Sequence, residues 1–276
     1  MSYRLICDSC TDPTPDLRGD PHFTMVPLSI HVGAETMADD GELRQAVLLE
    51  KMRAAPGGTK TSCPAPAAYL QHFCDGDNYV VTLSGRLSGS YNAAMQACAI
   101  YREEGGRGQV HVFNSRSATA GQTQAALLIR ELAGAGTPFR EVVDQVEAYL
   151  ERMQTLFVLE TLDNLRKNGR LTRMQSLVTG ALRVKLLMGA TPEGEIEKLG
   201  QGLSIRQTLG KMVSHIAADP GHVRKRLVLA HCNCQERVEH VRELVEQKCG
   251  FSEIVIVPTG GIATVYANNG GVVAAY

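Results

Sequence analysis

The sequence predicts an α/β protein of two domains, each built from a sheet flanked by helices. Short β-branched and apolar runs alternate with longer segments in which apolar residues recur every three or four positions. This alternation favours mostly parallel strands that helices cover on both faces. With 276 residues, 44% of them apolar, the chain is long enough for two ordinary hydrophobic cores. We expect an N-terminal domain over residues 1–154 and a C-terminal domain over residues 155–276.

The first half contains strand and helix patterns in alternation. The last helix is the clearest, because its apolar residues fall on one face at the spacing of an amphipathic helix. The apolar run FTMVPLSIHV is expected to form a single strand. The expected strands cover 4–7, 23–32, 79–84 and 109–115, and the expected helices cover 41–54, 88–103, 120–133 and 141–153.

The second half begins with the β-branched run TLFVLET, expected as a strand over 155–161. Two short helical stretches flank Gly169, over 162–168 and 172–178. A hairpin should follow, with its turn at Pro192-Glu193-Gly194. The remaining expected elements are helices over 204–217 and 235–248 and strands over 226–232 and 253–258.

Composition and charge exclude several classes of function. The formal net charge is -1, so the overall balance suggests neither nucleic acid nor an anionic membrane as a partner. Charged residues interrupt the opening segment, and no run of about 18 apolar residues occurs. We therefore expect a cytoplasmic protein with no integral membrane association.

The pair Cys7 and Cys10, in CDSC, allows three interpretations: a redox dithiol, half of a zinc site, or chance. A thioredoxin-type pair should open a helix, whereas Pro13 and Pro15 make the following residues extended or turn-like. The segment His231-Cys232-Asn233-Cys234 is a poor second ligand pair for zinc. We favour the third interpretation and expect no metal.

Four loops that follow expected strands are rich in hydroxyl groups and glycine. In an open α/β sheet, ligands bind outside the carboxyl ends of the strands, so these hydroxyls should form a donor-rich pocket. Helix capping is the alternative for any one loop. The loops cover 8–12, 60–64, 84–91 and 114–119.

A hydrolase or transferase that uses Ser88 is the rival hypothesis from another class. The nucleophile elbow Gly-x-Ser-x-Gly is not met, because Ser88 stands one place away in Gly85-Arg86-Leu87-Ser88-Gly89. No Walker A motif and no Gly-x-Gly-x-x-Gly after a strand occurs. These hydroxyls therefore look like binding groups, and we expect no catalytic residue.

Five segments together resemble the DegV family of bacterial fatty-acid-binding proteins, over nearly the whole chain. The most specific is LDNLRKNGRLTR, which is similar to the family's Leu-Arg-Lys-Gly-Gly-Arg-Ile-Ser signature. In DSCTD, Cys10 stands where the family has threonine, which makes CDSC a chance substitution. The matching segments are DSCTD (8–12), TSCPAP (61–66), LSGRLSGSYNAA (83–94), FNSRSATAGQ (113–122) and LDNLRKNGRLTR (162–173).

The resemblance implies a two-domain DegV-like fold with a long-chain fatty acid in a tunnel between the domains. It implies that the fatty acid is a ligand, that no cofactor is bound, and that a fatty-acid kinase receives the carboxylate. By motif position, Thr61, its neighbour Ser62 and Ser88 would bind the carboxylate.

The last segment departs from the family's His-x-Gly-Pro-Gly pattern, because Ala267 stands at the histidine. The resemblance then leaves Asn268 or Asn269 as replacements for that carboxylate ligand. It further implies that Arg170 belongs to a surface outside the acyl pocket that docks the kinase, and Arg206 would belong to the same surface.

Overall fold

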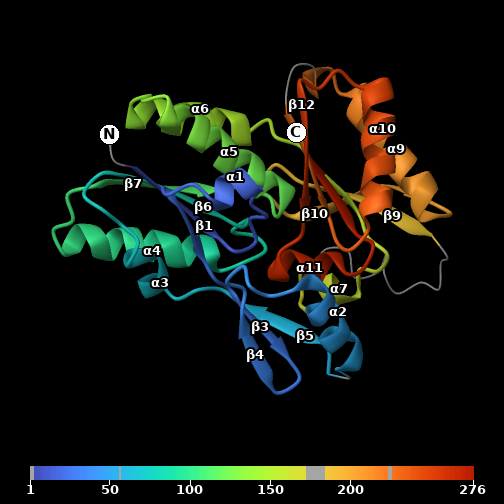
Figure 1. The fold of residues 1–276 in the computed structure, drawn as a ribbon, viewed down its shortest axis with the longest axis horizontal. Coiled ribbons are helices and arrows are strands. Elements are labelled where there is room, and N and C mark those ends of the chain that lie inside the picture. Colours follow the sequence, from blue (N-terminus) through green and yellow to red (C-terminus); the bar gives the residue numbers. More distant parts are fainter. Residues whose placement is uncertain (1–2, 56, 172–183, 223–225) are drawn as a thin grey trace.

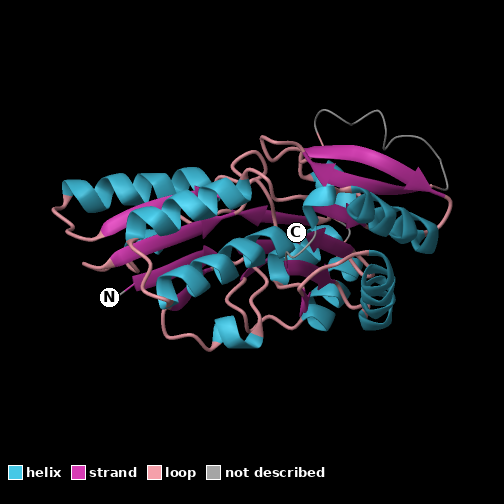
Figure 2. Cartoon of the chain, turned by 90° about the horizontal axis from the view of Figure 1, so that it is seen from above, coloured by secondary structure: helices cyan, strands magenta, loops and turns pink. Residues whose placement is uncertain are grey.

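The structure is a computed structural model that describes residues 3–55, 57–171, 184–222 and 226–276. The expected helix over 172–178 lies outside the described residues. Strands form three sheets, and helices lie on both faces of the sheet nearest the N-terminus (Figures 1 and 2). No helix in the described ranges is long and apolar enough to cross a bilayer.

The first sheet is entirely parallel, as the strand–helix alternation predicts, with the order β2-β1-β6-β7. Side chains alternate between its faces: Val80 packs in one core with α4, and Val81 in the opposite core with α5 and α6. The elements are β1 (Tyr3–Asp8), β2 (Phe23–Val26), β6 (Asp77–Thr82), β7 (Gln109–Asn114), α1 (Pro15–Arg18), α3 (Pro66–Leu70), α4 (Ser90–Glu103), α5 (Ala120–Gly134) and α6 (Phe139–Leu150).

The expected strand over 23–32 is wrong as a single element. It divides at Pro27, which lacks the N–H that a continuous ladder needs. β2 lies before this proline, while β3 (Ser29–Val32) belongs to a small antiparallel sheet with β4 (Glu35–Ala38) and β5 (Thr59–Ser62). Thr61 therefore lies on a strand, opposite Ile30, and α2 (Gln45–Ala54) connects β4 to β5.

The third sheet has the order β10-β9-β8-β13-β11-β12, and only its β11–β12 pair is parallel. The expected hairpin is the antiparallel pair of β9 and β10, and the C-terminal strand also runs antiparallel to both its neighbours. The elements are β8 (Thr155–Val158), β9 (Lys185–Ala190), β10 (Ile196–Gly202), β11 (Arg226–His231), β12 (Glu253–Pro258), β13 (Val272–Ala275), α7 (Asp163–Lys167), α9 (Ile205–Ala218), α10 (Gln235–Lys248) and α11 (Gly261–Ala267), with a short 3-10 helix at Pro220–His222.

Helix α5 joins the two large sheets. Its apolar residues share one core with β1 and β6 on one side and with β11 and β13 on the other. The Gln124 amide also donates to the carbonyls of Arg226 (2.7 Å) and Ala275 (2.9 Å). Because both sheets pack on one helix, the segments that follow their strands are brought to a common region.

Candidate functional site

A cavity of about 310 Å³ lies where segments from all three sheets meet. Most of its wall is apolar, and the apolar side chains come from loops, strands and helices of both halves of the chain. The principal apolar lining residues are Leu28, Leu83, Leu87, Phe157, Leu159, Leu165, Ile196, Ile262 and Val273. Such a wall suits a long apolar ligand better than a polar metabolite.

Three polar side chains of the wall come together from distant parts of the chain: Thr61, Tyr266 and Arg170. The hydroxyls of Thr61 on β5 and Tyr266 on α11 are 2.6 Å apart, and either one can donate. The Arg170 guanidinium carbon lies 5.8 Å from the centroid of the Tyr266 ring, within cation–π range. The group thus brings a positive charge and two hydroxyls together, and because one hydroxyl donates to the other, one O–H is left free to donate to an anion.

Tyr266 remains a hydrogen-bond donor at neutral pH. Burial raises the pKa of its phenol, while the hydrogen bond to Thr61 and the charge of Arg170 act in the opposite direction. The net effect is a pKa above the ordinary value near 10, so the phenol keeps its proton. Tyr266 is not among the residues predicted from the sequence, because the family's histidine pattern points to the next position, Ala267.

Arg170 reaches the cavity because the chain turns back after α7. Gly169 has a φ of +74°, and the N–H of Arg170 donates to the carbonyl of Leu165 at 2.8 Å, as in a Schellman motif. The Arg170 Nε then donates to the carbonyl of Leu87 at 3.1 Å. Arg170 therefore lines the cavity instead of lying outside it, while contact of this residue with a kinase stays a prediction.

Ser88 also lines the cavity, just before α4. Its oxygen accepts a hydrogen bond from the N–H of Ser90 (3.2 Å) and lies 3.1 Å from the Ser90 hydroxyl. Within the described part of the chain, no imidazole or carboxylate forms a hydrogen bond with the Ser88 hydroxyl. The arrangement supplies a donor to a ligand but no general base for a nucleophile.

Ser62 is exposed at the edge of the cavity. Its hydroxyl lies 3.0 Å from Nε2 of His31, whose Nδ1 lies 3.0 Å from the hydroxyl of Thr36. A hydroxyl, rather than a carboxylate, therefore orients this imidazole. Of the two neighbouring hydroxyls predicted in this segment, Thr61 is the one that contacts the Tyr266 phenol.

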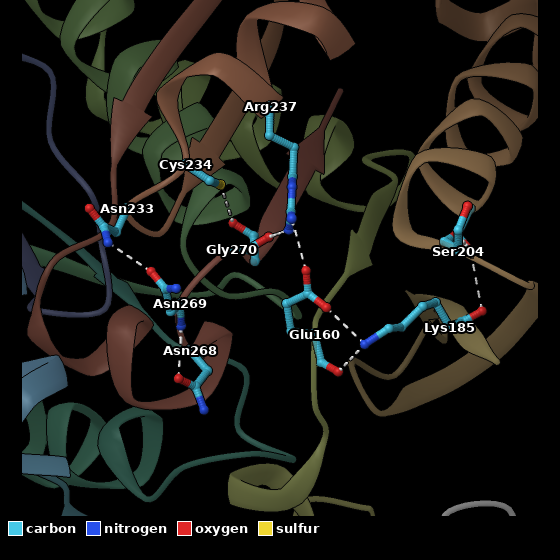
Figure 3. Close-up of polar contacts among 11 residues, drawn as sticks. Glu160, Lys185, Ser204, Asn233, Cys234, Arg237, Asn268, Asn269 and Gly270 are labelled. Atoms are coloured by element: carbon cyan, nitrogen blue, oxygen red, sulfur yellow. Dashed lines mark hydrogen bonds and ion pairs between the residues drawn. The ribbon is translucent and has the colours of Figure 1, made fainter. Parts of the chain in front are cut away.

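Asn268 lies beyond α11 and is not part of the cavity wall. Its Oδ1 accepts from the N–H of Asn269 at 2.8 Å, and Asn269 in turn accepts from the Asn233 amide at 2.7 Å (Figure 3). The expected substitution of an asparagine for the family's histidine therefore has no support in the geometry. At this point the wall is formed by the methyl group of Ala267 instead.

An ion-pair group holds the segment that follows Asn268 (Figure 3). Glu160 accepts from Lys185 and from Arg237, both at 2.8 Å, and Arg237 also donates to the carbonyl of Gly270. Burial would raise the pKa of Glu160, but the hydrogen bonds and charges of Lys185 and Arg237 bring it below its ordinary value. This group joins β9, α10 and the segment that follows β8, and none of its three side chains lines the cavity.

Arg206 is exposed near the start of α9 and lines a shallow second pocket together with Arg237 and His240. None of these three residues lines the main cavity. The structure therefore does not bring Arg206 and Arg170 to one pocket.

Cys7 and Cys10 are fully buried. Burial raises the pKa of both thiols, and the neighbouring Asp8 carboxylate raises them further. Such thiols are poor nucleophiles and poor metal ligands. No group of three or more potential metal ligands occurs in the described ranges. Cys10 instead contributes to the cavity wall.

Two buried carboxylates hold the beginning of α11, the helix that carries Tyr266. Asp39 accepts from the N–H groups of Gly261 (2.9 Å) and Ile262 (2.8 Å), one on each carboxylate oxygen. Asp12 accepts from the N–H of Gly260 at 2.6 Å through Oδ1, while its buried Oδ2 has no partner among the described residues. Burial raises the pKa of both carboxyl groups.

These contacts predict opposite effects for two similar substitutions. Asp39→Asn places an NH₂ group against a backbone donor and should lower the free energy of unfolding by about 1–3 kcal/mol. Asp12→Asn keeps the acceptor for Gly260 and removes an acidic group whose ionised form is disfavoured by burial, so it should be neutral or stabilising at pH 7. Because the folded-state pKa of Asp12 is raised, any gain from Asp12→Asn should disappear below about pH 4 and increase as the pH rises. Urea unfolding at pH 4 and pH 7 measures both effects, and equal destabilisation by the two variants would contradict the assignment.

Comparisons with known proteins agree with this architecture. The family model described as "Uncharacterised protein, DegV family" matches residues 2–276. A DegV domain-containing protein of Streptococcus gordonii is 33% identical over 279 residues, covering 100% of this chain and 99% of that protein.

Solved structures of similar proteins carry fatty acids. A DegV-family protein from Ruminococcus gnavus, refined with vaccenic acid, has a TM-score of 0.96 and 44% identity, covering 100% of this chain and 99% of its own. The Streptococcus pneumoniae fatty acid kinase B3 protein, loaded with linoleic acid, has a TM-score of 0.88 and 32% identity at the same coverage. The two-domain DegV-like fold expected from the sequence is thereby confirmed. The chain belongs to the DegV family.

Proposed function

We propose that this protein binds a long-chain fatty acid, with the acyl chain in the 310 Å³ cavity and the carboxylate at Thr61, Tyr266 and Ser88. The observation that carries the proposal is the Thr61–Tyr266 hydroxyl pair, 2.6 Å apart, in a wall that is mostly apolar. The fatty acids carried by similar solved structures support the same ligand class.

The energetics suit this ligand. Burying one methylene contributes ~0.8 kcal/mol, so about fifteen of them supply on the order of 10 kcal/mol before ordering costs. A buried carboxylate is tolerated only when it is hydrogen-bonded. The hydroxyls of Thr61 and Tyr266 can supply these hydrogen bonds, and the charge of Arg170 lies beside them. The carboxylate therefore does not need a direct ion pair with the guanidinium.

The proposal includes presentation of the bound carboxylate to a fatty-acid kinase, which would form the acyl phosphate. Its support is the similarity to the fatty acid kinase B3 protein of S. pneumoniae. In this proposal the chain is a cytoplasmic carrier rather than an enzyme. Ser88 then acts as a hydrogen-bond donor. This agrees with its contacts among the described residues, which include no imidazole or carboxylate that could act as a base.

Mass spectrometry of an organic extract from the purified protein tests the proposal. We expect near-stoichiometric long-chain fatty acid from the unsubstituted protein and markedly less from Thr61→Val. Addition of a bacterial fatty-acid kinase and ATP should then yield acyl phosphate. Absence of fatty acid, together with no binding of added oleate, would refute the carrier function. Binding without acyl phosphate would refute only the presentation step.

A further inference from the structure

One short segment contacts the backbone near three of the cavity's polar residues, Thr61, Ser88 and Tyr266. Its residues Asn164, Asn168 and Arg170 each donate to a carbonyl in a different part of the chain. The Asn164 amide donates to Val265 (2.6 Å), the Asn168 amide to Thr59 (2.9 Å), and the Arg170 guanidinium to Leu87 (3.1 Å).

The acceptors have a common relationship to the site. Val265 immediately precedes Tyr266, Leu87 immediately precedes Ser88, and Thr59 lies two residues before Thr61 on the same strand. These three polar residues come from three elements or loops that share no sheet: α11, the segment before α4, and β5. One segment of the second half therefore contacts the chain within two residues of all three.

The local structure explains why one segment reaches so many partners. Asn164 lies in the first turn of α7, and Asn168 lies at its end, where its amide also donates to the Asn164 carbonyl at 2.9 Å. Gly169, with φ +74°, then reverses the chain so that Arg170 points to a third partner. The side chains of Asn164, Asn168 and Arg170, spread over about one and a half turns, therefore point to three different segments.

We propose that Asn164 and Asn168 are positioning residues for the carboxylate site. They fix the relative placement of Tyr266 and Thr61 through the backbone, while Arg170 does the same for Ser88 and also contributes its charge. This inference rests on the proposed fatty-acid binding. It assigns to the most specific motif of the sequence, LDNLRKNGR, an internal role at the headgroup.

The test separates positioning from general stability by comparing two ligands of equal chain length, oleate and oleyl alcohol. Asn164→Asp and Asn168→Asp keep the shape of the side chain but remove the amide donor. We expect each variant to bind oleate about tenfold more weakly, because a donor misplaced by a fraction of an ångström leaves the carboxylate poorly bonded. Affinity for oleyl alcohol should change less than about twofold.

A matched control is Asn78→Asp, since the Asn78 amide also donates to backbone carbonyls (Cys74, Gly76 and Gln109), but outside the cavity wall. This control should lower thermal stability without changing the ratio of the two affinities. Asn164→Ala and Asn168→Ala serve as second variants where the aspartate prevents folding. In a Thr61→Val, Tyr266→Phe background, the asparagine substitutions should no longer affect oleate binding.

The outcomes distinguish this inference from the function on which it rests. If the asparagine variants lose affinity for oleate and oleyl alcohol in parallel, or leave both unchanged, the positioning role is refuted while fatty-acid binding survives. If the unsubstituted protein binds neither ligand, the proposed function and the inference are both refuted. A selective loss for oleate that disappears in the doubly substituted background supports the proposal.

Discussion

Thr61→Val combined with Tyr266→Phe is expected to weaken oleate binding by at least about a hundredfold. Each substitution keeps the shape of its side chain and removes one hydroxyl donor, and each loss leaves part of a buried carboxylate unpaired at a cost of about 1–3 kcal/mol. The two hydroxyls lie 2.6 Å apart, and a carboxylate beside them can accept from both once each O–H rotates away from their mutual hydrogen bond. Isothermal titration or displacement of a fluorescent fatty acid measures the change.

The same double variant should bind oleyl alcohol almost as well as the unsubstituted protein, because the acyl wall is untouched. Tyr149→Phe is the matched control: the Tyr149 hydroxyl oxygen is buried and has no hydrogen-bond partner within the described residues, and Tyr149 is absent from the cavity wall. Equal loss of affinity for acid and alcohol would show that the carboxylate binds elsewhere. The effect should persist from pH 6 to 9, since the raised pKa of Tyr266 keeps its phenol protonated in that range.

Part of this site could be predicted from the sequence because it depends on local motifs. Thr61 and Ser88 were expected by motif position, and the structure places both in the cavity wall. Tyr266 could not be found in this way, because its role depends on α11 facing β5, a contact between residues 205 positions apart. Asn268 illustrates the converse: the motif suggested a ligand, yet the turn after α11 directs its side chain to Asn269.

The fold, too, could be predicted only in part from the sequence. Apolar runs predicted most strands near their observed positions, but a run does not encode its partner or the direction of pairing. The segment 23–32 therefore concealed two strands in different sheets, and the mixed pairing of the third sheet was missed. The hairpin turn was predictable, because Gly194 adopts a φ of +85° that few other residues tolerate.

The cavity wall offers a second large effect, at Ala190. Ala190 on β9 pairs directly with Ile196 on β10, so their side chains share a face of the sheet, and both line the cavity. β10 is an edge strand, and Ala190 is only half-buried, so the backbone should accommodate a larger residue. Ala190→Phe would place an aromatic ring in the space that the acyl chain needs.

Ala190→Phe should therefore weaken oleate binding by about a hundredfold, since excluding about four methylenes forfeits ~0.8 kcal/mol for each of them. Unlike the hydroxyl variants, Ala190→Phe should weaken the binding of oleyl alcohol as much as the binding of oleate. The ring obstructs the acyl chain, which both ligands share, and not the headgroup. Glu197→Phe is the matched control, as Glu197 follows Ile196 on β10 and faces the other side of the sheet. That control should bind both ligands normally. Unchanged affinity in Ala190→Phe, in a protein with the thermal stability of the control, would mean that the acyl chain occupies another part of the molecule.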